Sequence, residues 1–170
     1  FQYFHIPYLW HFVVYVSFFH FVRQFYGVFR WYLFLQKNHH SYLLDTLFYL
    51  LMLTPIVCMH FRSDISAFSY YGDIDTFHYS SEKLFDFFKY FNSAVFLSWI
   101  IYEVRFYLKF KILELSRLTY FITTIILFNL VGFFATNAMM VILPIISSHG
   151  LQYYLLLGRT VNAFHITSLI

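Results

Sequence analysis

Cysteine is nearly absent from this chain, which has one, Cys58, among 170 residues. A single thiol excludes an intrachain disulfide framework and a metal cluster held by several thiolates. Cys58 stands inside an apolar run, where cysteine behaves as a small hydrophobic residue. We therefore expect it to be buried and to contribute packing only.

Charged side chains are also scarce, at 11% of the chain against roughly 25% in ordinary soluble domains. Hydrophobic residues make up 61% and aromatic residues 26%. A soluble domain of this size leaves much of its surface in water and cannot bury so much apolar area. The composition predicts an integral membrane protein whose main partner is the lipid bilayer. No run of basic residues occurs, which disfavours nucleic-acid binding.

Linkers and internal repeats are absent too, and the chain has only 3 prolines and 5 glycines. The sequence therefore predicts one all-α domain over residues 1–170, a polytopic bundle of transmembrane helices. The chain starts at Phe1 without a methionine and ends at Ile170 within another apolar segment. We expect it to be part of a longer protein.

Five segments have the length of about 20 mostly apolar residues that a membrane-crossing helix needs. Pro7 suits the start of the first helix, and Pro55 predicts a kink in the second. Pro144 and Gly150 predict a turn before the last segment. The expected spans are residues 6–26, 42–61, 87–108, 118–143 and 151–170.

The connections between these spans differ in the sign of their charge. Residues 28–41 carry two basic side chains and no acid, and residues 105–117 carry four basic side chains and one acid. Residues 62–86 carry five acids and two basic side chains. Because basic residues accumulate in cytoplasmic loops, we expect the first and third connections inside and the N-terminal end outside.

Polar side chains interrupt the first span along one side of the predicted helix. His20, Arg23 and Gln24 share a face at 100° per residue, and His149, Gln152 and Tyr153 repeat their spacing. Such a face can bind a metal through the imidazole while the other groups orient it or bind substrate. Hydrogen bonding between helices is the alternative, and Arg23 can instead extend to the head groups.

Nine histidines in so apolar a chain are the main functional signal. Ionisable residues at membrane depth usually mark cofactor sites, proton relays or substrate paths, and imidazole is the commonest metal ligand. Histidines near helix ends can instead hydrogen-bond water or head groups. The candidate metal ligands are His11, His20, His39, His40, His60 and His149.

The expected topology separates these histidines by depth. It places His20 near the inner face and His149 near the outer face, about 20 Å or more apart across a core of about 30 Å. On that topology the two cannot share one metal. Asp45 is expected either to orient His20 or His40 or to interact with the dipole at its helix start.

Established catalytic motifs do not occur in the chain. The histidine boxes of membrane desaturases, the HExxH motif, the Walker A motif, GxGxxG and GxSxG are all missing. The spacing of the histidines permits one transmembrane haem and disfavours a stack of two. The pair of segments H-x-x-x-Q-x-x-G, at residues 20–27, and H-x-x-Q-Y, at residues 149–153, resembles a class of uncharacterised bacterial polytopic membrane proteins. That resemblance implies a location in the bacterial inner membrane and no assigned activity.

These observations favour an oxidoreductase that uses a histidine-liganded metal, iron for example, or a haem, and acts on a lipophilic substrate. Two alternatives stay open. One is a transporter or permease with intramembrane histidine, aspartate and arginine side chains along its path. The other is a structural subunit that packs against further helices of the same chain or against other membrane subunits.

Overall fold

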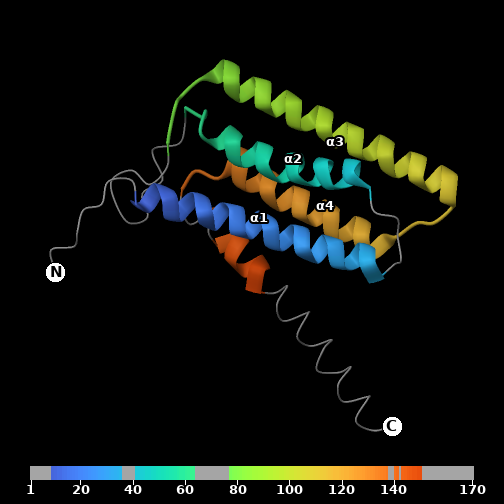
Figure 1. Ribbon diagram of the computed structural model, residues 1–170. Helices are drawn as coiled ribbons and strands as arrows, with labels where there is room; N and C mark the ends of the chain where they lie inside the picture. Colours follow the sequence, from blue (N-terminus) through green and yellow to red (C-terminus); the bar gives the residue numbers. More distant parts are fainter. Residues whose placement is uncertain (1–8, 36–40, 64–76, 138–139, 142, 151–170) are drawn as a thin grey trace, which may run out of the picture.

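The computed structural model describes residues 9–35, 41–63, 77–137, 140–141 and 143–150. Its helices are α1 (Leu9–Leu35), α2 (Tyr42–Met59), α3 (Glu82–Phe110) and α4 (Leu115–Asn129), and α4 continues into the π-helical turn η1 (Leu130–Phe134). The predicted all-α fold is therefore confirmed. Successive helices run antiparallel in one bundle (Figure 1). We name its two ends after residues that lie there, the Met59 end and the Lys111 end.

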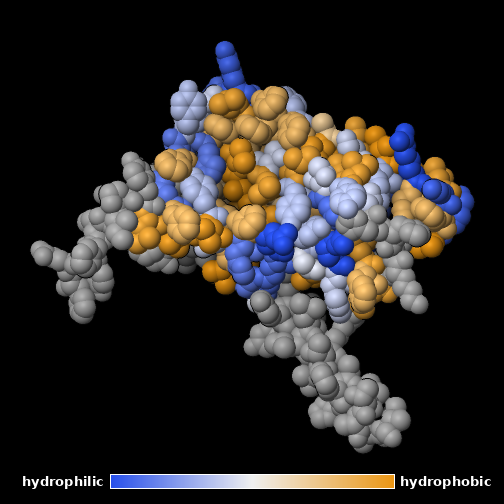
Figure 2. Space-filling model, in the orientation of Figure 1, coloured by the Kyte–Doolittle hydropathy of each residue, from blue (hydrophilic) through white to orange (hydrophobic). Residues whose placement is uncertain are grey.

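Four helices are long and apolar enough to cross a membrane: His11–Leu35, Tyr42–Met59, Glu82–Phe110 and Leu115–Phe134. The chain is thus an integral membrane protein, as its composition predicts. Figure 2 shows apolar residues over much of one face, with hydrophilic residues toward its ends and in a group over α1. The first helix continues past the predicted span 6–26 to Leu35. The predicted span 151–170 lies outside the described residues.

The helix boundaries follow local chemistry where the chain offers a cap. At the start of α3, the side chain of Ser81 accepts a hydrogen bond from the backbone N–H of Leu84 at 3.4 Å. At its end, Lys111 takes a left-handed conformation with φ of 56°, a common way to end a helix. In α2, Asp45 lies in the first turn, where an acid is favoured by the helix dipole, and Pro55 lies inside the helix.

Aromatic rings from all four helices meet in the interior of the bundle. Phe29 of α1 stacks on Phe48 of α2 with ring centroids 4.9 Å apart, and Trp99 of α3 stacks on Phe121 of α4 at 4.6 Å. Phe48 also meets Phe121 edge to face at 5.4 Å, so the two stacked pairs form one aromatic cluster. In a bilayer, helices are held together by packing and polar contacts because lipid tails are as apolar as leucine. The high aromatic content thus supplies the packing that joins four helices.

Helix α3 lies at the edge of the bundle beside α2 (Figure 1). Only Asn92, Val95 and Trp99 of its residues are buried. The amide Nδ2 of Asn92 donates to Oδ1 of Asn129 in α4 at 2.7 Å. This bond joins α3 to α4 across the bundle. Most of α3 therefore faces outward, toward lipid.

A close approach of two backbones joins α2 to η1. A Cβ atom on Gly132 would lie 2.4 Å from the carbonyl oxygen of Pro55. Only glycine fits at this position, because any larger residue would push the two helices apart. The proline of one helix and the π-turn of the other therefore face each other at the same level.

The fourth predicted span, residues 118–143, is wrong as a continuous helix, because the chain breaks at Ala135. Ala135 is extended, with φ of −63° and ψ of 128°. The buried side chain of Arg62 donates from Nη1 to the carbonyl of Ala135 at 2.8 Å and so satisfies the end of the helix. Asn137 then accepts the backbone N–H of Met140 through Oδ1 at 3.0 Å, as a helix N-cap does.

Residues 143–150 are helical and return alongside α1 (Figure 1). Val141 and Ile145 of this segment pack with Met59, Val131 and Ala135, and Phe18 and Phe21 of α1 lie against them. The segment therefore belongs to the bundle, and its histidine, His149, is carried toward the middle of α1.

Candidate functional site

His20 and His149 lie side by side, with ring centroids 5.7 Å apart and their planes tilted by 56°. The expectation that some 20 Å or more separates them is therefore wrong. It assumed that residues 118–143 form one straight helix, whereas the break at Ala135 lets the following segment return along α1. The two stripes meet at their histidines.

Phe21 completes the surroundings of the pair. Its ring lies 5.3 Å from His149, edge to face, and 6.0 Å from His20. The ring of His20 comes from the exposed side of α1, and that of His149 is partly buried. The pair is thus backed by an aromatic ring on one side and open on the other side.

Gln24 lies one helical turn after His20 on the same face of α1. Its Oε1 atom is buried and has no hydrogen-bond partner within the described residues. A buried amide oxygen without a partner is costly, so this atom is suited to a ligand or a water molecule. The other expected members of the stripes, Gln152 and Tyr153, lie outside the described residues, as do His39 and His40.

Arg23 turns away from this pair toward α2. Its Nη1 donates to the hydroxyl of Tyr49 at 2.8 Å, and its guanidinium lies 5.8 Å from the centroid of the Tyr26 ring. Nearer the Lys111 end, Nη1 of Arg30 lies 3.4 Å from a carboxylate oxygen of Asp45. The arginines of α1 thus bind α2, and Asp45 binds Arg30 instead of orienting His20.

The remaining expected ligands, His11 and His60, lie at the Met59 end around Phe77. Nδ1 of His60 donates to the carbonyl of Phe77 at 2.6 Å, and the hydroxyl of Tyr15 accepts the backbone N–H of Phe77 at 3.1 Å. The ring of His11 contacts that of Phe77 at 4.5 Å. Burial lowers the pKa of His60, and the bond to Phe77 partly opposes that shift. These residues join the segment before α3 to α1 and α2.

No group of three or more His, Cys, Asp or Glu side chains suited to a metal ion occurs within the described residues. The candidate site consists there of two histidines and one amide oxygen. His11 and His60 do not extend it, because His149 approaches His20, and His11 lies nine residues earlier, about 13 Å along the helix axis.

A buried charge cluster between α3 and α4 was not expected from the sequence. Arg117, only 2% exposed, donates from Nη1 and Nη2 to the two carboxylate oxygens of Glu103 at 2.6 and 2.5 Å, and from Nε to Glu114 at 2.8 Å. Trp99 adds an N–H bond to Glu103 at 3.1 Å. The i, i+3 spacing of Glu114 and Arg117 was the one available signal.

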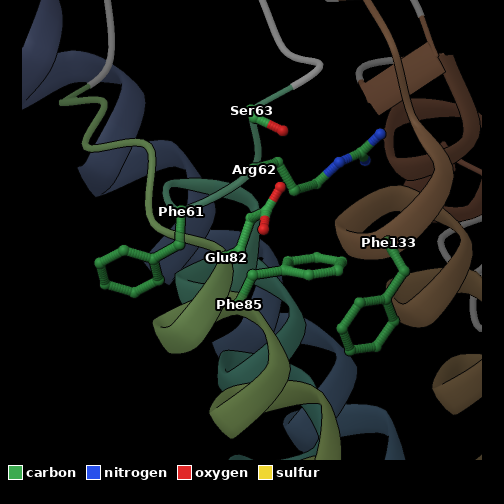
Figure 3. A pocket seen from close by; sticks show the side chains of 6 residues that line it. All are labelled: Phe61, Arg62, Ser63, Glu82, Phe85 and Phe133. Atoms are coloured by element: carbon green, nitrogen blue, oxygen red, sulfur yellow. The ribbon is translucent and has the colours of Figure 1, made fainter.

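A cavity of about 220 Å³ lies at the Met59 end, between the start of α3 and η1. Figure 3 shows Phe85 and Phe133 side by side, while the side chain of Arg62 reaches toward η1. The rings of Phe85 and Phe133 meet edge to face at 6.2 Å. The guanidinium of Arg62 caps the helix end, as described above, so it has a structural role here. The lining residues are Phe61, Arg62, Ser63, Glu82, Phe85 and Phe133.

The fold and these contacts define a polytopic α-helical membrane protein with a pair of histidines against its first helix. Comparison with models of protein families, with characterised proteins and with solved structures finds no match. Function is therefore argued from the histidine pair itself.

Proposed function

We propose that the chain is a membrane oxidoreductase that binds a metal ion between His20 and His149 and acts on a lipophilic substrate. The observation that carries this proposal is the 5.7 Å separation of the two imidazole rings. Histidines at membrane depth commonly serve cofactors or proton transfer. Imidazole suits iron and copper, two metals that change oxidation state.

The distance between the rings favours a single ion over a haem. Imidazoles that bind one tetrahedral ion through bonds of about 2.0–2.1 Å have centroids roughly 5 Å apart. Two axial ligands on opposite sides of a haem iron would lie about 6.4 Å apart at the same bond length, with the macrocycle between them. The tetrahedral angle gives about 5.2 Å at this bond length, so the observed 5.7 Å is nearer to the value for two adjacent ligands.

Gln24 supports the same site from the next turn of α1. Its buried Oε1 atom, which has no partner within the described residues, can bind the ion or the N–H of a bound imidazole. Two histidines and one amide oxygen leave coordination positions for substrate. The site lies on α1, and lipid can reach it through the exposed side of His20.

Metal analysis of the purified protein tests this proposal. We expect about one iron or copper ion for each chain of the unsubstituted protein. His20→Ala and His149→Ala should each reduce metal occupancy at least tenfold. Even the loss of a group that only hydrogen-bonds to a metal ligand lowers metal affinity about 10–100-fold. His78→Ala provides a matched control, because this exposed histidine lies at the Met59 end, away from the pair.

Two results would contradict the proposal. One is unsubstituted protein that holds neither a metal ion nor a haem after purification in detergent without chelators. The other is equal metal content in the unsubstituted protein and in both alanine variants, with helical content preserved. A visible spectrum of the same samples distinguishes a haem from a free ion.

We also propose that the Lys111 end faces the cytoplasm of a bacterial cell and the Met59 end faces outward. The Lys111 end carries the basic side chains of Arg105, Lys109 and Lys111, all of which are exposed. The Met59 end carries Glu82 and Asp86 among its exposed residues. The preference of basic residues for the cytoplasmic side supports this orientation.

A further inference from the structure

A groove of about 430 Å³ lies between α1 and α4 near the Lys111 end. Its lining residues are Tyr32, Leu115, Ser116, Thr119, Tyr120 and Thr123. Five of these six carry a hydroxyl group. Polar groups at membrane depth require partners, because lipid tails cannot hydrogen-bond. So many hydroxyls in one groove therefore need an explanation.

Two of the hydroxyls are used by the fold. Tyr120 donates to the carbonyl of Phe25 at 3.0 Å, and this bond joins α4 to α1. Thr123 donates to the carbonyl of Thr119 at 2.9 Å, a bond within its own helix. These two hydroxyls therefore do not require a ligand.

The hydroxyls of Tyr32, Ser116 and Thr119 are different, because none of them bonds to another residue in the described part of the chain. Tyr32 contacts Tyr120 through its ring, with centroids 5.4 Å apart, so its position in the groove is fixed by packing. Ser116 and Thr119 are exposed and lie one turn apart on α4. Three hydrogen-bonding groups therefore point to the same space from two helices.

Among the described residues, no charged side chain lines the groove. The nearest in sequence, Glu114 and Arg117, are buried and bind each other at 2.8 Å. An anionic or cationic head group would thus have no counter-charge here, and burying a charge without one is costly. A neutral ligand with oxygen atoms fits the lining.

Apolar side chains follow the hydroxyls along α4 and fit a hydrocarbon chain. Ile122 and Ile126 follow Thr119 and Thr123 on α4, and both are exposed, at 41% and 52%. The helix thus presents hydroxyls near its start, at the boundary of the span, and isoleucines farther in. A lipid has the same order, with polar atoms at the interface and an acyl chain below them.

We propose that this groove binds a neutral lipid whose ester, carbonyl or hydroxyl oxygens bond to Tyr32, Ser116 and Thr119. The site is separate from the histidine pair, because Tyr32 lies twelve residues after His20, about 18 Å along α1. The inference therefore goes beyond the proposed metal centre and does not depend on it.

Photolabelling in vesicles of phosphatidylcholine tests the site. The probe is a trace of diacylglycerol that carries a diazirine on one acyl chain, and labelled peptides are identified by mass spectrometry. We expect the label to concentrate on residues 115–126. Excess unlabelled diacylglycerol should compete with it, whereas squalene, which has no oxygen, should not.

A variant without the three hydroxyls, Tyr32→Phe with Ser116→Ala and Thr119→Val, keeps the shape of the groove. Labelling should fall about fivefold for each hydroxyl removed, because a typical hydrogen bond contributes that much to binding. The matched control removes two exposed hydroxyls elsewhere, Thr46→Val with Ser98→Ala. Each of these two hydroxyls donates only to a carbonyl of its own helix, at 2.9 Å. Removing it should therefore leave labelling unchanged.

Three results would overturn the proposal. Equal labelling of the triple variant and the unsubstituted protein would mean that the hydroxyls bind water only. If squalene competes as strongly as diacylglycerol, the groove binds the lipid through apolar contacts alone. A dimer seen by size-exclusion chromatography in detergent, and lost in the triple variant, would assign the groove to a second copy of the chain.

Discussion

His60 shows how a single side chain joins three parts of the molecule. It ends α2, donates to the backbone of Phe77, and lies 5.6 Å from the ring of Tyr15 in α1. The carbonyl acceptor requires a proton on Nδ1, which the neutral imidazole supplies as well as the charged one. Burial therefore decides the pKa of His60, and it favours the neutral form.

The lowered pKa of His60 predicts a dependence of stability on pH. Below its ordinary pKa of about 6.5 the unfolded chain binds a proton more readily than the folded chain, so the free energy of unfolding falls as pH decreases. Above that value both states are neutral and the contribution is constant. The slope for one group is at most about 1.4 kcal/mol per pH unit.

Thermal or denaturant unfolding in detergent between about pH 8 and pH 5 measures this effect. His60→Asn keeps an N–H donor near the position of Nδ1 and removes the titrating group, so this part of the acid slope should disappear. His78→Asn, a change at an exposed neighbour, should leave most of it. A slope that His60→Asn does not alter would show that another group is responsible.

At the scale of residues, the sequence predicted correctly which side chains share a helix face. It did not predict which side chains from other helices they contact. The 100° periodicity places His20 and Gln24 on one side of α1, and one turn does separate them in the helix. The depth of His149 was inferred by counting residues along one straight helix, and that count fails at Ala135. Asp45 was expected to orient His20 or His40, or to interact with the dipole of its helix; it lies in the first turn of α2, 3.4 Å from Arg30 of α1, and His40 lies outside the described residues.

At the scale of elements, α2 and η1 approach each other closely at Pro55 and Gly132. Pro55 removes one backbone N–H from α2, and the π-turn of η1 widens the other helix at the same level. Gly132 lets the two backbones meet there. The irregular turns of both helices are therefore packed against each other and not against lipid.

Gly132→Ala should reduce the free energy of unfolding by about 1–3 kcal/mol, the usual cost of forcing extra volume into a packed interior. The new Cβ would lie 2.4 Å from the Pro55 oxygen, which is backbone and cannot rotate away. Gly27→Ala provides a matched control, because nothing lies within 4 Å of a Cβ at that position of α1. This control should be neutral or slightly stabilising, since alanine is favoured over glycine in a helix.

Unfolding in a series of detergent and sodium dodecyl sulfate mixtures compares the two alanine variants. If both lose the same free energy, or neither does, the close approach of Pro55 and Gly132 does not limit stability.

The sequence predicted the four long helices but not the break in the last one. Apolar composition continues through Ala135, so a search for apolar length cannot detect the interruption. The one local signal is Asn137, because asparagine is among the preferred N-caps and Met140 follows it at the capping distance. The bond from Arg62 to Ala135 joins residues 73 positions apart, and no local pattern predicts it.

At the scale of the whole molecule, the bilayer explains why the fold class was predictable. In lipid every backbone group needs a partner inside the chain, so a strongly apolar sequence of this length forms helices or a closed barrel. The apolar segments have the length of a membrane-crossing helix, which favours helices over a barrel. The return of residues 143–150 along α1 depends on tertiary contacts and so was not predictable in the same way.

The proposed orientation predicts which end of the bundle reagents can reach from outside a cell. Tyr79→Cys and Ile112→Cys each place a thiol at an exposed position, at 68% and 51% exposure, without changing charge. A membrane-impermeant maleimide should label the first in intact cells and the second only after permeabilisation. The unsubstituted protein controls for Cys58, which is buried and should stay unlabelled. The reverse pattern would place the Lys111 end outside.

The unequal lengths of α2 and α3 tie the fold to the thickness of its membrane. The 18 residues of α2 extend about 27 Å, close to the hydrocarbon thickness of about 30 Å, whereas the 29 residues of α3 extend about 43 Å. The surplus turns of α3 carry charges at both ends, among them Lys83 and Lys109. Hydrophobic mismatch of this kind is relieved by tilt. The angle of that tilt is set by the packing of α3 against α2 and by its polar contacts with α4.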